Sequence, residues 1–496
     1  MTRILILLLL PGVVYADDKE LKPLPGTKAL KMDGDIAAKL VAGVDKCLLD
    51  EIEKSTDMRA KHWKRDFTSA KAYNASIEPN RKRLAHMLGV RDPRISFDEL
   101  PIQATFSNSG VIASSKKVKV YSVRWPAFGK VHGEGLLLEP TWGAKATVIV
   151  IPDADQIPEN LVGLIGNIPA KEQYARLLAE SGIRVVIPVL VSRTIEPRKK
   201  RRPLPGREFI YRQAFEMGRH ILGYEIQKVL ALVDFFTKKG ETKLGVTGYG
   251  EGGLIAMYCA ALDPRIDAAL LSGVVENRNN AWHHMIERNV FGLLTEFGDA
   301  EILSMIAPRP VVVEASKMPE RTLGNGFGIV APHELKTPSL DEIKKEMTRF
   351  RRLVSDFKVH APLIVSGKEG KGKPGSLQAI QAFLGKDGLN VDVKYSLDSP
   401  VLTPHQINLK AINQREYRVI EEMEDHTQAL LRDSPEVRKK FFSKLDTTSL
   451  ESFKKTIEPY REIFATEIIG RFDQKPLPFN ARTRIQYEKE KWTGHQ

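Results

Sequence analysis

The middle of the chain alternates short apolar runs with segments whose apolar positions recur every three or four residues. Apolar runs of this kind predict strands that are buried on both faces, and the spaced pattern predicts the helices that cover them. The predicted strands are residues 147–151, 185–190, 244–247, 268–272, 311–315, 363–365 and 391–395. The predicted helices are residues 171–181, 215–237, 254–262, 340–357 and 377–384.

The two ends of the chain have a different pattern. Residues 36–54 have helical apolar spacing, whereas residues 118–125 and 133–138 read as strands joined by a turn. Residues 413–432 and 436–464 look like charged amphipathic helices, and the tail after residue 472 is polar and irregular. We therefore predict an α/β fold, a three-layer sandwich around a mostly parallel sheet, with an N-terminal helical region and a C-terminal helical extension.

The first residues predict export. Arg3 precedes an apolar run at residues 4–10, and Val14 and Ala16 form a small-residue cleavage site. The run is shorter than the roughly 20 residues needed to span a bilayer, so stable membrane insertion is not expected. The predicted divisions are a signal peptide at 1–16, a helical region at 17–100, the sheet domain at 101–400 and the C-terminal extension and tail at 401–496. The mature protein is then periplasmic or extracellular.

Composition narrows the possible partners. The chain has 75 Lys and Arg against 62 Asp and Glu, a net charge of +13. Its densest basic run, residues 198–202, is bordered by prolines and has no interleaved aromatic residues. This favours a solvated loop over contact with an acidic polymer, whether an anionic polysaccharide or a nucleic acid. The two cysteines, Cys47 and Cys259, lack zinc-type spacing and are predicted to be buried thiols, although a single disulfide between them stays open. No metal or cofactor is expected.

One glycine-rich corner has the layout of a catalytic turn. Residues 244–247 form a strand that leads through Gly248, Gly250 and Gly252 into an apolar helix. This is the spacing of Gly-x-nucleophile-x-Gly, in which the central residue carries the attacking side chain on a sharp strand-to-helix turn. The central residue here is Gly250, which has no side chain to attack with.

The corner and several other stretches resemble the α/β-hydrolase superfamily. The other stretches are residues 123–126, 133–140, 152–156, 207–220, 260–268, 272–273, 297–302 and 306–310. The chain is most similar to secreted bacterial relatives of acetyl xylan esterases and dienelactone hydrolases, in a subgroup found in planctomycete-type bacteria. The resemblance implies that glycine at the nucleophile position is usual in this subgroup. It also implies a possible partner, because some members continue into a second hydrolase domain with an intact serine.

The remaining triad positions are only partly filled. Glu314 follows the strand at 311–313 and fits the acid position, but no histidine stands in residues 366–376, after the strand at 363–365. His360 and His405 are poorly placed, and His220 is expected in the middle of a helix as a hydrogen-bonded structural residue. The backbone N–H of Glu251 could still donate to an oxyanion. Shifting the turn by one residue would make Glu251 the nucleophile, but Tyr249 would then stand where a small residue is needed.

Several carboxylates are expected at the carboxyl ends of the strands. Two interpretations give them a function, as ligands of a cation such as Ca²⁺ or as paired acid and base acting on a sugar. The favoured interpretation is that arginines satisfy them, because buried carboxylates need partners. The carboxylates are Asp153, Asp155, Glu251, Glu276 and Glu314, and the arginines are Arg193, Arg288 and Arg309.

Two functional hypotheses follow. The first is an exported, catalytically degenerate hydrolase-like protein that binds a carbohydrate, a carbohydrate ester or a partner hydrolase. The second is an active carboxylic ester hydrolase with an unconventional set of catalytic residues, such as Glu251. A structural envelope protein would fit the basic composition but would not explain the retained turn.

Overall fold

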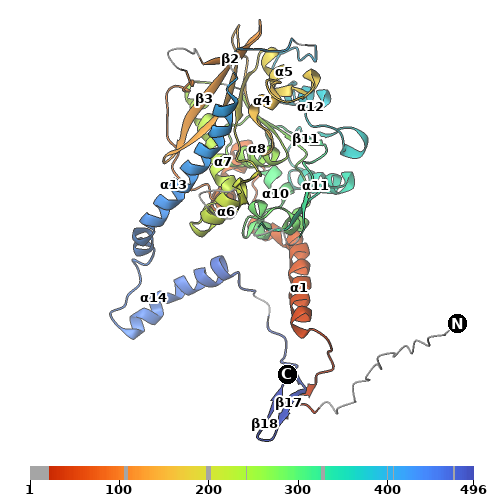
Figure 1. The fold of residues 1–496 in the computed structure, drawn as a ribbon, viewed down its shortest axis with the longest axis vertical. Coiled ribbons are helices and arrows are strands. Elements are labelled where there is room, and N and C mark those ends of the chain that lie inside the picture. The colour runs from red at the N-terminus through yellow and green to blue at the C-terminus, as the bar shows by residue number, and fades with distance from the viewer. Residues whose placement is uncertain are drawn as a thin grey trace, which may run out of the picture. The chain divides into compact units, whose positions relative to one another are not determined.

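A twisted sheet forms the centre of the fold (Figure 1). The computed structural model describes residues 22–104, 110–196, 203–241, 243–324, 330–398, 400–405, 407–472 and 475–496. The predicted signal peptide and the basic run at 198–202 lie outside the described residues. The chain divides into one unit formed by Asp50–Val437 and a second formed by Met1–Leu49 with Arg438–Gln496.

The sheet of the larger unit has ten strands in the order β14-β11-β10-β9-β5-β6-β4-β3-β2-β15. From β14 to β6 every neighbouring pair is parallel, and from β6 to β15 every pair is antiparallel. The parallel strands are β5 (Thr147–Ile151), β6 (Arg184–Pro188), β9 (Leu244–Tyr249), β10 (Ala268–Ser272), β11 (Val311–Ala315) and β14 (Leu363–Val365). The antiparallel strands are β2 (Val111–Ser114), β3 (Val118–Phe128), β4 (Val131–Pro140) and β15 (Thr403–Pro404).

Both faces of the sheet are covered, as the continuous apolar strands predict. In β5, Ile149 and Ile151 belong to one hydrophobic core and Val148 and Val150 to the other, because successive side chains point to opposite faces. The first core includes residues of α3 (Glu78–Met87), α7 (Ile221–Lys238), α8 (Glu251–Leu262), α10 (Asp299–Ser304) and α11 (Leu340–Leu353). The second includes residues of α4 (Pro158–Leu161), α5 (Tyr174–Glu180) and α12 (Leu377–Leu384). The predicted three-layer α/β sandwich is confirmed.

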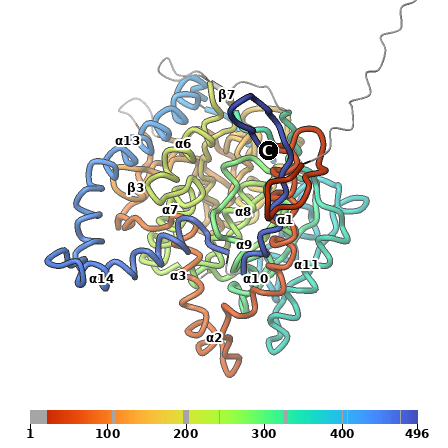
Figure 2. The backbone as a smooth tube through the Cα atoms, turned by 90° about the horizontal axis from the view of Figure 1, so that it is seen from below, coloured from red at the N-terminus to blue at the C-terminus, as the bar shows by residue number. Residues whose placement is uncertain are grey.

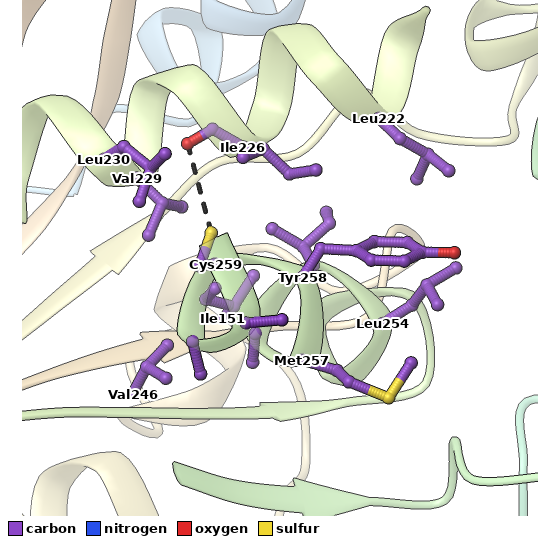
Figure 3. Packing of buried hydrophobic residues seen from close by; sticks show 14 of the residues in the cluster. Ile151, Leu222, Ile226, Val229, Leu230, Val246, Leu254, Met257, Tyr258 and Cys259 are labelled. Carbon is purple, nitrogen blue, oxygen red and sulfur yellow. Dashed lines mark hydrogen bonds between the residues drawn. The ribbon is translucent and has the colours of Figure 1, made fainter. Parts of the chain in front are cut away.

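Helix α8, which follows the glycine corner, is buried along its whole length up to Ala261. It packs between α7 and α10 (Figure 2). Figure 3 shows the contact with α7, where the Cys259 sulfur lies 4.0 Å from the carbonyl oxygen of Ile226. Burial raises the pKa of the Cys259 thiol well above its usual value. An apolar helix with no polar face fits only the interior of the fold.

Helix α13 (Leu409–Phe441) extends the larger unit well past residue 400. It lies beside β3 (Figure 1) and buries Val419, Ile420 and Met423. Its Arg415 binds Glu159 in a buried ion pair at 2.9 Å, and its Glu422 pairs with Arg124 of β3 at 2.5 Å. The unit formed by Asp50–Val437 therefore reaches beyond the predicted 101–400 domain at both ends.

Five local predictions are wrong. The helix predicted at 436–464 begins only at Leu450, because α13 continues to Phe441. The helix predicted at 215–237 is two helices, α6 (Gly206–Glu216) and α7, because the chain turns at Gly218 with φ of 65°. Residues 391–395 are not a strand. Cys47 is exposed rather than buried. The predicted irregular tail contains β16 (Arg482–Thr483), β17 (Ile485–Lys489) and β18 (Trp492–His495).

The smaller unit is built from both ends of the chain. Strand β1 (Lys28–Ala29) pairs in parallel with β16, and β17 pairs with β18 as a hairpin. Helix α14 (Leu450–Ile463) buries none of its residues. In the part of the chain that the structure describes, no helix is long and apolar enough to cross a membrane.

Candidate functional site

The glycine corner has the backbone geometry of a nucleophile turn. Strand β9 ends at Tyr249, helix α8 begins at Glu251, and Gly250 between them has φ of 55° and ψ of −116°. A β-carbon at Gly248 would lie 2.2 Å from the Gly252 carbonyl oxygen, and one at Gly252 would lie 2.2 Å from the Ile151 carbonyl oxygen. Both flanking glycines are therefore required for the chain to turn this sharply.

The space in front of Gly250 is filled. A β-carbon added there would lie 2.6 Å from Asp153 Oδ2 and 2.9 Å from Pro319 Cγ. Asp153 follows strand β5 and is 1% exposed. Any nucleophilic side chain at this position would collide with that carboxylate, so the turn has neither the attacking group nor the room for one.

The predicted oxyanion donor is also occupied. The backbone N–H of Glu251 donates to Asp153 Oδ2 at 2.9 Å. The positive end of a helix favours a negative charge at this position. The Asp153 side chain thus takes the place at which an esterase would stabilise the oxyanion of its reaction intermediate.

A buried arginine cluster surrounds the Glu251 carboxylate. Arg193 donates to Glu251 Oε2 at 2.9 Å and Arg207 to Glu251 Oε1 at 3.1 Å, while Arg288 lies 3.6 Å from Oε2. Burial alone would raise the pKa of Glu251, but Arg207, Arg288 and Arg193 together lower it to about 2. The carboxylate is charged, fully buried and held in place, so it cannot reach a substrate.

Arg193 connects this cluster to the loop after β5, and Arg207 connects it to helix α7. Arg193 also binds Asp153 at 3.0 Å and Asp155 at 3.1 Å, and Arg207 also binds Glu225 at 2.8 Å. Sequence reasoning missed Arg207, which stands just after the basic run. The signal that could have found it is that Arg207 opens the stretch 207–220, which resembles the hydrolase superfamily.

Glu314, at the position of the triad acid, has a structural role in this protein. Glu314, near the end of β11, accepts hydrogen bonds from Ser272 Oγ at 2.6 Å, from the Gly375 N–H at 2.8 Å and from the Ser376 N–H at 2.9 Å. The last two residues belong to the loop after β14, where a triad would supply its histidine. The carboxylate therefore holds the loop by its backbone.

The histidines lie elsewhere. His405 Nε2 is 2.7 Å from Ser114 Oγ, next to β15 at the edge of the sheet opposite to β14. His220 caps α7 by accepting a hydrogen bond from the Leu222 N–H at 3.1 Å, and burial lowers its pKa to about 4. It is a hydrogen-bonded structural residue, as expected, but it precedes the helix rather than lying within it.

Arg309 does not join the carboxylates. It donates only to backbone carbonyls, among them those of Ala260 at 2.7 Å and Ile266 at 2.6 Å. The prediction that it satisfies a carboxylate is wrong, because the residue turns toward the end of α8. No group of three or more His, Cys, Asp or Glu side chains that could hold a metal ion occurs among the described residues.

Glu276, just past β10, lies at the side of this cluster and lines a pocket. Arg278 contacts its Oε1 at 3.3 Å, Arg288 lies 3.7 Å from the same oxygen, and His284 Nε2 lies 3.6 Å from Oε2. Burial raises the pKa of Glu276 to about 7 despite the two arginines. The Glu276 pocket has a volume of about 360 Å³ and is lined by Glu276, Asn277, Asn280, His283, His284, Glu334, Lys336, Thr337, Pro338 and Glu342.

Comparison with known proteins shows what this region is similar to. The family model described as "Dienelactone hydrolase family" matches residues 134–284. The Bacillus subtilis (strain 168) protein named "Putative hydrolase YtaP" is 28% identical over 150 residues, which are 28% of this chain and 45% of that protein. The chain thus spans about half the length of this curated relative.

Two solved structures illustrate the structural similarity. A putative acetyl xylan esterase from Bacteroides fragilis NCTC 9343 is 13% identical, with a TM-score of 0.45 over 70% of this chain and 89% of that one. A glucuronoyl esterase from Solibacter usitatus is 11% identical, with a TM-score of 0.37 over 72% and 94% of the two chains. The family match covers strands β5, β6, β9 and β10 and the turn at Gly250, so residues 134–284 are similar to the dienelactone hydrolase family in the part of the sheet that carries the candidate site.

Proposed function

We propose that this protein acts by binding a carbohydrate or a carbohydrate ester and has no serine-type hydrolytic activity. The observation that carries the proposal is the carboxylate of Asp153, which takes the N–H of Glu251 at 2.9 Å and fills the space in front of Gly250. Acyl transfer needs a nucleophile and a free oxyanion site at this point. The polar pocket beside the turn supports a retained binding role.

The alternative of an ester hydrolase that uses Glu251 has less support. A carboxylate nucleophile must reach the carbonyl carbon of its substrate to about 3 Å. Glu251 is fully buried and held by Arg193 and Arg207. Releasing it would break two buried ion pairs, each of which is costly to open.

Hydrolysis of 4-nitrophenyl acetate by the purified full chain tests the proposal. We expect no turnover above the buffer rate in the parent protein or in Gly250→Ser, because the added hydroxymethyl group would meet Asp153. The double variant Gly250→Ser/Asp153→Gly removes that carboxylate, so its comparison with Gly250→Ser isolates the effect of Asp153. Turnover by the parent that is lost in Glu251→Gln would contradict the proposal.

We also propose export to the periplasm or the exterior. The support is the signal-peptide pattern ending near Ala16. N-terminal sequencing of the protein isolated from its native host should give a mature chain that begins near Asp17. A mature protein that retains residues 1–16 would contradict this proposal.

A further inference from the structure

The Glu276 pocket differs from the sealed turn beside it because some of its polar groups have no hydrogen-bond partner among the described residues. Glu276 is 6% exposed, and its Oε2 receives no hydrogen bond from a described residue, since His284 Nε2 is 3.6 Å away. The Asn277 side-chain oxygen accepts the Asn279 N–H at 3.0 Å. The side chain of Asn280 makes no hydrogen bond within the described chain and faces the pocket.

The wall that carries these groups is rigid. The Glu276 N–H donates to Asp299 Oδ2 at 3.0 Å, and the buried Arg278 binds both Asp299 and Glu276. Beyond it, the indole of Trp282 stacks on the His283 ring with centroids 3.5 Å apart, and Trp282 is 46% exposed. A rigid polar wall beside an exposed aromatic ring is a prepared surface rather than a mobile loop.

The chemistry of the lining excludes several kinds of ligand. An acyl chain would need apolar walls, and Pro338 is the one aliphatic side chain among the lining residues. The lining has three acidic side chains, those of Glu276, Glu334 and Glu342, and one ammonium, Lys336, so it offers an anion no unpaired cation even where Glu276 is protonated. Glu334 and Lys336 also pair with each other at 2.8 Å.

We propose that the Glu276 pocket binds one or two units of a neutral saccharide, and that it disfavours sugars bearing a carboxylate. The amides of Asn277 and Asn280 and the carboxyl of Glu276 combine donors and acceptors, as adjacent sugar hydroxyls require. The volume of about 360 Å³ lies in the range of small-molecule sites. The inference rests on the proposed binding function and adds the location and the ligand class.

Isothermal titration calorimetry of the full chain with xylotriose and cellotriose tests the pocket. We expect at least one trisaccharide to bind, and Asn280→Ala to weaken that binding roughly 5-fold, because the variant removes one hydrogen bond. Asn413→Ala, another exposed asparagine without a described contact, is the matched control and should leave binding unchanged. Thermal melting checks that both variants fold.

A second arm tests the charge preference. Xylotriose carrying one glucuronic acid branch should bind roughly 10-fold more weakly than xylotriose itself, because its carboxylate enters a pocket whose acidic lining side chains outnumber its one basic side chain, which is already paired. Failure of both neutral trisaccharides to bind, unchanged binding in Asn280→Ala, or preference for the acidic sugar would each overturn the pocket. Ester hydrolysis by the parent would instead overturn the absence of catalysis, so the two failures can be told apart.

Discussion

Two buried glutamates at the same edge of the sheet are in opposite electrostatic states. Glu251 follows β9 and receives arginine hydrogen bonds at 2.9 and 3.1 Å, and its pKa is about 2. Glu276 follows the neighbouring β10, its nearest arginine contact is 3.3 Å long, and its pKa is about 7. Burial penalises both charges, so the number and closeness of the cations decide which carboxyl stays ionised.

Arg288 lies between the two, 3.6 Å from Glu251 and 3.7 Å from Glu276. The carboxylate with two close arginines has become part of the structure of the turn. The one with longer contacts keeps an oxygen free at a pocket. The turn at Gly250 and the proposed binding pocket therefore depend on different strand ends, so a substitution in one need not change the other.

The largest effect is expected where the sealed cluster is broken. Arg207→Ala leaves Glu251 and Glu225 buried with one cation fewer, and should lower the free energy of unfolding by about 3–5 kcal/mol. Arg212→Ala is the control, because Arg212 is 46% exposed and pairs with Glu208 only one helical turn away. It should cost less than about 1 kcal/mol. Equal urea midpoints for the two variants would contradict a structural role for the cluster.

The second prediction is that Glu251 and Glu276 make the stability of the protein depend on pH in opposite directions. The lowered pKa of Glu251 contributes stability that is present above about pH 4.5 and is lost as the pH falls toward 2. The raised pKa of Glu276 means that the folded state binds more protons than the unfolded state between pH 4.5 and 7, so stability falls as the pH rises. Each contribution has a limiting slope of about 1.4 kcal/mol per pH unit.

Urea unfolding at several pH values separates the two contributions. In the parent, the free energy of unfolding should decline between pH 4.5 and 7 because of Glu276, and in Glu276→Gln this decline should be absent. The stabilisation by Glu251 above pH 4.5 should be the same in both proteins. The groups that face Glu276 are Arg278, Arg288, His284, Asp299 and Glu342, and the last two raise its pKa. Burial and the two arginines lower the pKa of His284 to about 2, so it does not titrate in this range. Parallel pH profiles for parent and variant would show that Glu276 is already ionised in the folded protein.

The sequence predicted the sheet well because its strands are apolar runs that need no long-range information. Strands β5, β10, β11 and β14 have the predicted bounds. The turn at Gly250 was equally easy to predict from the sequence, since three glycines in alternate positions are typical of such a turn. Local pattern failed at Gly218, where one positive φ divides a helix that apolar spacing alone would continue.

The state of the site could not be predicted in the same way. Asp153 and Glu251 are 98 residues apart, and nothing in the local sequence indicates that the Asp153 carboxylate accepts a hydrogen bond from the backbone N–H of Glu251. Arg193, Arg288 and Arg309 were predicted to satisfy the carboxylates as a group, without individual pairs, and Arg207 was not predicted to join them. Which carboxylate receives which arginine depends on loop paths after the strands, and those paths are set by tertiary packing.

The smallest of these effects concerns Glu314, at the position of a triad acid. In a working esterase the acid orients a histidine, so its amide variant impairs catalysis more than stability. Here Glu314→Gln exchanges an acceptor oxygen for a donor next to the N–H groups of Gly375 and Ser376. We expect a loss of about 1–2 kcal/mol in the free energy of unfolding, since an unmatched donor remains buried. Ser272→Ala, which removes only the 2.6 Å hydroxyl contact, should cost about 1 kcal/mol or less.

Faster proteolysis within residues 366–376 in Glu314→Gln than in Ser272→Ala would show that the carboxylate holds this loop. If both variants were as stable as the parent, Glu314 would have no structural role, and its retention would point back to chemistry at the turn.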